Sequence, residues 1–513
     1  MPERYIYRTG KSTDALAFFD VDFRSNDPTE QTPRLEDDET ISSFVPSVDS
    51  VGLTISSGAY APSIHASGKG VRIWLEAGTV GATYHVTAAI VTSGSAAKSF
   101  LARSYSRTFA VEIGDVVAGS IIQLGPTNVD VRSYGADPNY SSDSTQAFRD
   151  ALSGASPGTQ INVPTGRYRV GDGASDIFTF PYQGVKLVGP EQGQMGGPRV
   201  FGSDDTLSGA QLNVHGTGQL FHLRRNSAVK NLTLYYPEQN VNSAPVPCGL
   251  TFYVHQNEHH VTIENIVAVN PYDFVSIAPT GVAGPTHIRH VMAWPLHSGI
   301  VAGRAPGVLL HEVSFNNIDS ASGATLIAWV QANAVAYQLG GVEQFDITDC
   351  FAFGYRDGLL FENVTGSPFY GEYGSWKGGG FDQCNNCVRV APTTSLGCLG
   401  FKMSSAQLIP NVGGEAVLIE DNHVPASDAE KPWLSFDAVG VHQFAGHQRA
   451  LRAAASSYAN VLWEKSAWLN MTVAGATNSS ANAKLILDKI GMSSGVTRST
   501  GAGSITDLHP VTL

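Results

Sequence analysis

The sequence predicts an all-β protein in which a small β-sandwich precedes a parallel β-helix that carries one short α-helix. Only 15% of the 513 residues are charged and 54 are glycine, a composition that favours a turn-rich β protein over a helical bundle. Short apolar runs separated by turns fill the first 115 residues, and a recurrent apolar-x-x-apolar unit follows from about residue 211. A chain of this length is expected to hold two or more domains.

The first 115 residues have the pattern of a small β-sandwich, with short strands expected at 17–19, 40–44, 51–55, 71–75, 83–86 and 90–92. We assign residues 1–115 to this domain and residues 116–128, which include Gly125-Pro126-Thr127, to a linker. Acidic residues at 20, 22 and 36–39 fit either calcium ligands or solvated turns, and we favour turns.

Residues 129–170 predict a strand, a short helix and two further strands. The first strand contains Val129 and Val131, and Asp143 with Gln146 has the spacing of a capping box at the start of a helix. An apolar stripe at helical spacing follows, and it ends at Gly154; its members are Ala147, Phe148, Ala151 and Leu152. Strands at 161–163 and 168–170 flank the turn Pro164-Thr165-Gly166.

A recurrent unit from about residue 211 to 425 predicts stacked coils. Copies start at residues 263, 288, 310, 347 and 419, so the steps are 25, 22, 37 and 72 residues. Coils of this size stack at about 4.8 Å, and unequal steps indicate loops inserted at a corner. We assign residues 129–447 to the β-helix and residues 448–513 to a C-terminal cap or trimerisation segment. Residues 449–467 fit a helix or a strand, and no amphipathic helix pattern competes before residue 448.

Two resemblances add to these patterns. The motifs Tyr134-Gly135-Ala136, Ser142 to Thr145 and Val163 to Tyr168 resemble the start of the pectate-lyase-type right-handed β-helix superfamily, although Asp137 to Tyr140 replaces its usual Gly-Asp-Gly. Residues 13–105 resemble the phage fibre–tail adaptor type of immunoglobulin-like domain. A chain with both features resembles a bacteriophage tailspike or virion spike. The resemblance to the β-helix superfamily implies that the short helix caps the end of the β-helix.

Composition excludes several classes of function. A net charge of −13 without a Lys/Arg cluster argues against nucleic acid as a partner. No run of 18 apolar residues occurs and the N-terminus lacks an apolar signal core, so neither membrane insertion nor a signal peptide is expected. Five scattered cysteines indicate reduced, buried thiols; the spacing Cys384-Asn-Asn-Cys387 leaves a zinc site as the alternative.

The first candidate site lies where matching positions of the repeated units stack. One column would contain Glu264, Arg289, His311, Thr348 and Glu420; the next would contain Asn265, His290, Glu312, Asp349 and Asp421. Glu312 and Asp349 would then lie one coil apart, and two neighbouring carboxyls suit glycoside hydrolysis. The alternative is that both are solvated turn residues. His290 would contribute to carbohydrate binding.

The second candidate site is the glycine-rich, aromatic segment 361–382. Tyr370, Tyr373, Trp376 and Lys377 would bind a glycan, and Glu362 and Glu372 would be its acids. An aromatic-stabilised loop or a subunit interface is the alternative. We predict no metal ligand in the chain and no cofactor, except calcium if the reaction were β-elimination.

The resemblance implies a spike on the virion surface, made in the host cytoplasm and joined to other virion proteins through residues 1–115. The partner expected for the β-helix is bacterial surface polysaccharide, which the spike either depolymerises or only binds as an adhesin. Spikes of this type imply a homotrimer, and a monomeric mass in solution would contradict that expectation.

Overall fold

The computed structural model describes residues 4–9, 17–22, 35, 39–49, 53–55, 57, 61–64, 68, 70–77, 83–93, 104–115, 128–171, 173, 176–181, 183–190, 209–317, 323–362, 373–391, 400–420, 433–442, 447–469, 471–492, 499–500, 503–509 and 511–512. The chain divides into two compact units, residues 1–164 with 181–188, and residues 165–180 with 189–513. Within the described ranges, no helix has both the length and the apolar character needed to cross a membrane.

The first unit begins with a β-sandwich, as predicted. One sheet has the order β1-β8-β7-β3, and the other has β2-β6-β4 with β5 paired to β6. The strands are β1 (Arg4–Thr9), β2 (Ala17–Asp22), β3 (Ile41–Val48), β4 (Leu53–Ile55), β5 (Ser63–Ile64), β6 (Gly70–Ala77), β7 (Thr83–Thr92) and β8 (Ser104–Asp115). The two strands predicted at 83–86 and 90–92 are therefore one strand.

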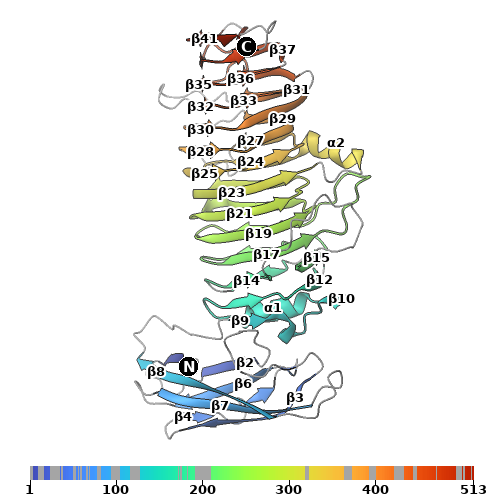
Figure 1. Ribbon diagram of the computed structural model, residues 1–513, viewed down its shortest axis with the longest axis vertical. Helices are drawn as coiled ribbons and strands as arrows, with labels where there is room; N and C mark the ends of the chain where they lie inside the picture. The colour runs from blue at the N-terminus through green and yellow to red at the C-terminus, as the bar shows by residue number, and fades with distance from the viewer. Residues whose placement is uncertain are drawn as a thin grey trace. The chain divides into compact units, whose positions relative to one another are not determined.

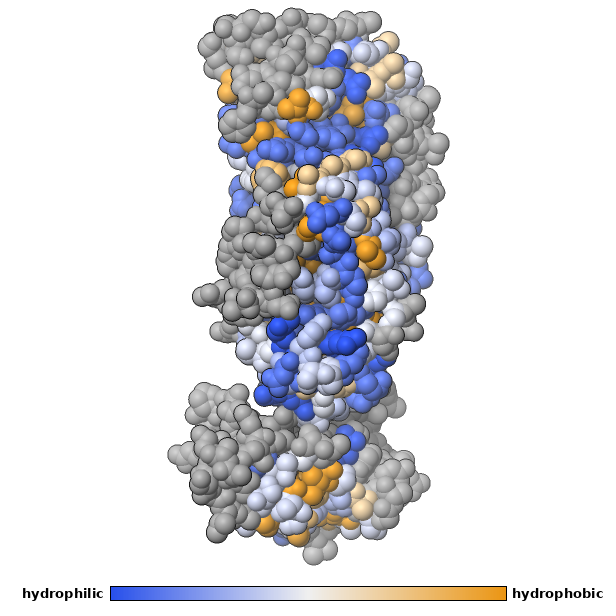
Figure 2. Space-filling view, turned by 90° about the vertical axis from the view of Figure 1, so that its right-hand side faces the viewer, coloured by the Kyte–Doolittle hydropathy of each residue, from blue (hydrophilic) through white to orange (hydrophobic). Residues whose placement is uncertain are grey.

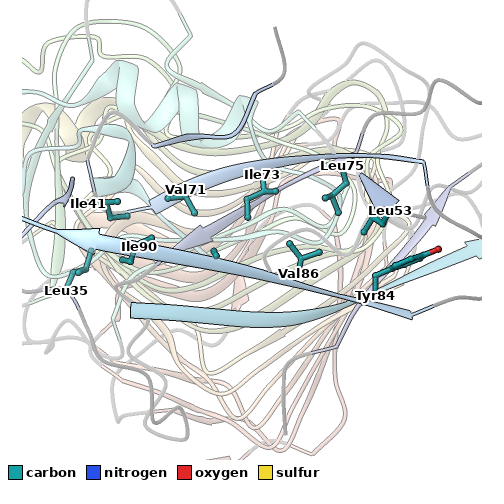
Figure 3. Close-up of a cluster of buried hydrophobic side chains, with 10 residues drawn as sticks. Leu35, Ile41, Leu53, Val71, Ile73, Leu75, Tyr84, Val86 and Ile90 are labelled. Atoms are coloured by element: carbon teal, nitrogen blue, oxygen red, sulfur yellow. The ribbon is translucent and has the colours of Figure 1, made fainter. Parts of the chain in front are cut away.

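The sandwich core is the row of side chains that both sheets turn inward (Figure 3). It consists of Leu35, Ile41, Leu53, Val71, Ile73, Leu75, Tyr84, Val86, Ala88 and Ile90. Alternate residues of β7 are buried, which is the period-2 pattern of a half-exposed strand. Of the acidic residues that calcium might use, Glu39 is buried and its carboxylate accepts a hydrogen bond from the Thr92 hydroxyl. Residues 36–38 lie outside the described residues.

The first unit also contains the short helix α1 (Thr145–Ser153). It follows β9 (Asn128–Asp130), the 3-10 helix η2 (Val131–Tyr134) and β10 (Asn139–Asp143), and it precedes β11 (Gln160–Asn162) and β14 (Lys186–Val188). Strands β9, β11 and β14 pair in parallel, and the predicted apolar stripe of α1 is buried. The predicted helix and its end at Gly154 are confirmed.

Only half of the predicted capping box is present: the Asp143 carboxylate accepts a hydrogen bond from the backbone N–H of Thr145, the first residue of α1, at 2.7 Å. Ser144 is the N-cap, and its hydroxyl accepts a hydrogen bond from the backbone N–H of Asp137 (2.9 Å) instead of from the helix. Gln146 donates forward to the Asp150 carboxylate at 2.8 Å, so it does not reach back to the cap. The Asp137 carboxylate accepts hydrogen bonds from Asn139, Ser141 and Ser142, and these bonds lower its pKa.

The second unit is a right-handed parallel β-helix, as predicted (Figure 1). Its strands are β12 (Gly166–Val170), β13 (Phe178–Thr179), β15 (Ala210–Val214), β16 (Phe221–Leu223), β17 (Ala228–Tyr235), β18 (Phe252–Val254), β19 (Val261–Val269), β20 (Asp273–Val282), β21 (Thr286–Ala293), β22 (Ser298–Arg304), β23 (Pro306–Asn316), β24 (Val335–Leu339), β25 (Gln344–Thr348), β26 (Phe351–Phe353), β27 (Asp357–Phe361), β28 (Gly374–Lys377), β29 (Gly380–Val390), β30 (Phe401–Ser404), β31 (Gln407–Ile419), β32 (Trp433–Asp437), β33 (Gly440–Val441), β34 (His447–Ala453), β35 (Ala459–Glu464), β36 (Ala467–Trp468), β37 (Met471–Asn478), β38 (Ala483–Asp488), β39 (Gly491–Met492), β40 (Ser499–Thr500), β41 (Ser504–Asp507) and β42 (Val511–Thr512).

These strands stack in three rows of parallel pairs. Row 1 runs through β17, β19, β21, β23, β25, β28, β30, β32, β35, β38 and β41. Row 2 contains the second halves of β17 to β23, then β26, the first halves of β29 and β31, and β33, β36, β39 and β42. Row 3 runs through β16, β18, β20, β22, β24, β27, the second halves of β29 and β31, β34, β37 and β40.

The interior of the β-helix is a continuous stack of apolar side chains. Phe221 lies 5.1 Å from Phe252 between ring centroids, and the aromatic stack continues through Phe274 and Phe315 to Tyr337. Matching positions on successive coils fall on top of each other, which is why aromatic residues recur there.

Four cysteines among the described residues are buried and free, which supports the structural interpretation of the thiols. Burial raises the pKa of Cys384 to about 12, and the thiol of Cys387 also lies inside the coils with a raised pKa.

Described residues from 447 to 512 form further coils of the same rows, so the boundary predicted at 447 is not a change of fold. Of the two alternatives for residues 449–467, the described residues form strands. A helix that the sequence did not predict, α2 (Ala324–Asn333), projects from the coils (Figure 1). Its own apolar residues are spread over all of its faces, although only Leu326 and Val330 are buried, so its sequence lacks the amphipathic period.

Candidate functional site

The corner between rows 1 and 2 is a column of left-handed backbone conformations. It stacks Asn231, Asn265, His290, Glu312, Asp349, Gly378, Ser405, Ala438, Lys465 and Lys489, all with positive φ. Neighbouring asparagines in such a column bond to each other, as the 2.9 Å hydrogen bond from Asn265 Nδ2 to Asn231 Oδ1 shows. Left-handed φ favours asparagine, glycine and other polar residues, so much of the polar pattern seen in the sequence reflects a turn.

Glu312 and Asp349 do lie on adjacent coils of this column, but their carboxylates turn to different neighbours. Glu312 Oε2 lies 3.6 Å from His290 Nε2, and Glu312 Oε1 lies 3.6 Å from His311 Nε2. Asp349 Oδ1 leans over the next coil, where a Cβ built on Gly378 would lie 2.1 Å from it. The Glu312 carboxylate is therefore shared with two imidazoles, and the catalytic role of Glu312 and Asp349 stays a prediction.

Four members of the predicted first column, Glu264 through Thr348, do stack on successive coils, but its predicted fifth member, Glu420, does not belong to it. Lys377 pairs with Thr348 on the next coil of row 1, followed by Ser404. Glu420 instead follows row 3, where its carboxylate bonds to Arg389 Nε at 2.9 Å. The unit predicted at residue 419 was therefore a different corner of the coil, and Asp421 lies outside the described residues.

The prediction that Trp376 binds a glycan is wrong. Its side chain is fully buried, with its ring 4.7 Å from Phe381 and 5.2 Å from Tyr337 between centroids, and its Nε1 donates to the Gly378 carbonyl. The residue occupies the inward position of β28, so it is part of the core.

The other members of that site are distributed over the surface. Tyr373 is 72% exposed and Lys377 is also exposed, whereas Glu362 accepts a hydrogen bond from Gln338 Nε2 at 3.1 Å. Tyr370 and Glu372 lie outside the described residues. The carbohydrate-binding and catalytic roles of these residues stay predictions.

The corner between rows 2 and 3 carries a second polar column, which the sequence did not reveal. In register on successive coils lie Asp273, Ser298, Val335, Asp357, Asn386, Glu415 and Arg449. We call this set the row 3 column. Helix α2 is inserted at the same corner, between β23 and β24, on the side of the β-helix that faces the viewer in Figure 2.

Three aromatic side chains form a platform at the start of this column. The rings of Tyr272 and His297 stack at 4.8 Å with 16° between their planes. Trp329 of α2 lies 6.3 Å from Tyr272 and 6.2 Å from His297, inclined to both. None of the three is buried. The coloured part of the side of the β-helix seen in Figure 2 is mostly hydrophilic with scattered hydrophobic spots. An exposed aromatic surface within a polar face is suited to stacking on a sugar ring.

Contacts with neighbouring coils hold His297 and helix α2 in position. Asp273 Oδ1 lies 2.8 Å from His297 Nδ1 and accepts a hydrogen bond from the Ser298 hydroxyl. Helix α2 buries Leu326 and Val330, and Asn385 Nδ2 donates to the Gln331 carbonyl at 2.7 Å. The orientation of the His297 ring is thus set by Asp273, and the backbone of α2 is anchored to a later coil.

Further along the row 3 column, Asp357 is a fully buried carboxylate. Its Oδ2 lies 2.8 Å from Arg356 Nε and 3.4 Å from Arg389 Nη1, and its Oδ1 accepts a hydrogen bond from Asn386 Nδ2 at 2.8 Å. Arg389 also bonds to Glu420, so one arginine joins two acids from different coils. A buried charge with this many partners holds adjacent coils in register.

Glu415 is the second buried acid of the column, and its two oxygens differ. Oε1 accepts from Arg449 Nη1 at 2.8 Å and lies 3.0 Å from Arg452 Nε. Oε2 is buried without a hydrogen-bond partner among the described residues. Burial raises the pKa of Glu415, against the opposing effect of Arg452 and Arg449. A carboxyl of this kind can carry a proton on the free oxygen and donate it.

A sequence signal for the missed acids did exist. Asp357 and Glu415 each begin a run of apolar residues shortly after a glycine, at Gly354 and at Gly413-Gly414. Asp273 and Ser298 begin strands at the equivalent position, 25 residues apart. The apolar-x-x-apolar unit of the sequence marks the row 1 corner alone, so it does not predict this second column.

The comparisons with known proteins bear on the first unit most directly. A family model described as podophage GP4 fiber-tail adaptor protein gp77 matches residues 14–112. The first domain is of the fiber-tail adaptor type. This confirms the resemblance predicted for residues 13–105. No curated protein matches the sequence.

Solved structures similar to the chain share little sequence with it. The mannuronan C-5 epimerase AlgE6 A-module of Azotobacter vinelandii is 15% identical, with a TM-score of 0.38 over 75% of this chain and 99% of that one. A Family 28 exopolygalacturonase of Yersinia enterocolitica is 11% identical, with a TM-score of 0.31 over 86% of each chain. A tailspike protein of E. coli bacteriophage HK620 is 10% identical, with a TM-score of 0.45 over 74% of this chain and 65% of that one.

Proposed function

We propose that this chain is a phage virion spike that binds bacterial surface polysaccharide through the row 3 corner of its β-helix. The adaptor-type match of residues 14–112 supports attachment to other virion proteins through that domain. The exposed platform of Tyr272, His297 and Trp329 carries the binding proposal. The virion surface as the location, and the homotrimer that the resemblance implies, belong to the same proposal.

The platform suits a carbohydrate for two physical reasons. Sugar rings present flat C–H faces that pack on aromatic rings, while their hydroxyl groups need nearby polar partners. Asp273 and Ser298 supply carboxylate and hydroxyl oxygens beside the rings, and burial with a smaller contribution from Asp273 raises the pKa of Tyr272. The Tyr272 phenol therefore stays protonated at neutral pH and can donate a hydrogen bond.

Replacing Trp329 by alanine is expected to weaken binding of the purified chain to host capsule or lipopolysaccharide by about 5-fold or more, since one aromatic stacking contact is worth about 1–3 kcal/mol. Binding is measured by surface plasmon resonance on immobilised polysaccharide. Trp433→Ala is the matched control, because Trp433 is 45% exposed on row 1, and it should bind as the original chain does. Equal loss of polysaccharide binding in both variants, or no loss of binding in Trp329→Ala, would contradict glycan binding at the platform.

A second candidate function, polysaccharide hydrolysis, is favoured by Glu415. Its Oε2 is buried without a hydrogen-bond partner among the described residues, and burial raises its pKa. Glu415 would protonate the glycosidic oxygen as the bond of that oxygen to the anomeric carbon breaks, and a water molecule would bond to that carbon and release its proton to solvent. Asp357 is not assigned as the base, because it is fully buried and its oxygens are engaged by Arg356, Arg389 and Asn386.

Glu415→Gln should abolish cleavage if this assignment is right, because the amide keeps the shape but has no acidic proton. Chain shortening of host polysaccharide is followed by size-exclusion chromatography, and ultraviolet absorbance separates β-elimination from hydrolysis. Glu312→Gln is the comparison at the row 1 corner, and it should cleave normally. Cleavage that survives in Glu415→Gln and is lost in Glu312→Gln would assign the chemistry to the other corner. No cleavage by the original chain would leave the adhesin function.

A further inference from the structure

We propose that His290, His311 and Glu312 form a binding site for a divalent first-row transition-metal ion such as Zn²⁺. The three side chains lie at the corner between rows 1 and 2, on two adjacent coils, β21 and β23. One ligand atom from each residue lies within 4.8 Å of the other two. The site goes beyond the proposed function, and it gives Glu312 a role other than the catalytic one that the sequence predicted.

The distances fit one ion held by all three residues. Glu312 lies between the two imidazoles, with Oε2 3.6 Å from His290 Nε2 and Oε1 3.6 Å from His311 Nε2. In a tetrahedral complex with bonds of about 2.0–2.1 Å, ligand atoms lie about 3.4 Å from each other. The two imidazole rings have centroids 5.7 Å apart and planes inclined by 68°, and one ligand atom of each ring lies within 4.8 Å of the other.

The backbone holds this geometry without the ion. Arg289 pairs with His311, and Val291 pairs with Val313, so parallel ladder bonds flank the site on both sides. His290 and Glu312 have the same left-handed conformation, with φ of 52° and 50°. Since they occupy equivalent corner positions, their side chains leave adjacent coils in the same direction. The site is therefore preorganised by the β-helix, and binding needs no movement of the chain.

The ligand set selects the class of ion. Two imidazoles and a carboxylate suit zinc, nickel, cobalt or copper, whereas calcium and magnesium prefer oxygen ligands alone. All three side chains are substantially exposed, between 41% and 56%, so the remaining coordination position faces solvent. A bound ion would join two neighbouring coils and would present an open position to a ligand from outside.

Isothermal titration of Zn²⁺ into the full, untagged chain tests the site. We expect one ion per chain with a micromolar dissociation constant, reversed by EDTA. His290→Ala, His311→Ala and Glu312→Gln should each weaken that binding by at least about 10-fold. His509→Ala is the matched control, because His509 also pairs with a carboxylate, Asp488 at 2.6 Å, and is 68% exposed. It should bind Zn²⁺ with unchanged affinity.

Two results would overturn the site. One is the absence of saturable Zn²⁺ binding by the original chain, and the other is equal binding by the original chain and by all three variants. Circular dichroism of each variant confirms that the β-helix has formed, so a loss of binding is not a loss of fold. The titration contains no polysaccharide, and Trp329→Ala should keep full Zn²⁺ affinity. Failure of the metal site and failure of the glycan platform are therefore observed separately.

Discussion

Replacing Trp376 by alanine is expected to lower the free energy of unfolding by about 3–5 kcal/mol. The ring is fully buried, it contacts Tyr337 and Phe381, and its Nε1 hydrogen bond to the Gly378 carbonyl would also be lost. The backbone around it is held by ladders to the coils on both sides, so the cavity cannot collapse easily. The midpoint of guanidinium unfolding, followed by tryptophan fluorescence and circular dichroism, measures the change.

Tyr373→Ala is the control for that experiment, because Tyr373 lies three residues away and is 72% exposed. It should change stability by less than about 0.5 kcal/mol. The same pair of variants also tests the original prediction that this segment binds a glycan. Polysaccharide binding that falls in Tyr373→Ala, with stability unchanged, would support a glycan contact at Tyr373. An unchanged midpoint in Trp376→Ala would contradict the position of Trp376 in the core.

Asp357→Ala is expected to destabilise the chain by about 3–5 kcal/mol, because it leaves the guanidinium groups of Arg356 and Arg389 without their shared carboxylate. Asn386 would lose the acceptor for its amide as well. Asp357 is fully buried, so water cannot replace it without rearrangement. Thermal unfolding by differential scanning calorimetry should show a clearly lower midpoint.

Asp346→Ala provides the matched comparison on row 1. Asp346 is exposed, and its carboxylate accepts a hydrogen bond from the Ser375 hydroxyl at 3.0 Å, so its removal should cost less than about 0.5 kcal/mol. A stability loss of similar size in both variants would mean that burial does not distinguish the two acids. Wild-type stability in Asp357→Ala would show that the arginines find other partners.

The row 1 corner was predictable because its residues stand at a fixed position in each repeated unit of the sequence. A left-handed turn recurs once per coil, and Asn265, His290, Glu312 and Asp349 each follow an apolar position by a constant interval. Sequence spacing therefore placed four members of the column correctly. It could not tell that the pattern is conformational, since a polar residue selected for positive φ and one selected for chemistry look alike in the sequence.

Trp376 was predicted to bind a glycan at the surface, and it is buried in the core for a related reason. An aromatic residue among glycines fits a surface loop and fits equally a strand whose neighbours must lie close to a ring. Here a Cβ on Gly374 would lie 2.1 Å from the Phe345 ring, so this glycine makes room for core packing. Which of the two applies depends on the direction of one side chain, and a strand of four residues leaves that direction open.

By itself, the sequence determined the all-β class, the short helix at 145–153 and the coil repeat, because these follow from local spacing, turn residues and composition. The adaptor-type first domain was identified by its resemblance to a known family. Only the tertiary structure decided which polar residues meet. The aromatic platform joins Tyr272, His297 and Trp329 from three successive coils, and the row 3 column joins Asp357 to Glu415 across loops of unequal length. Parallel coils pair residues 20 to 44 positions apart, and the inserted loops set that interval separately for each coil.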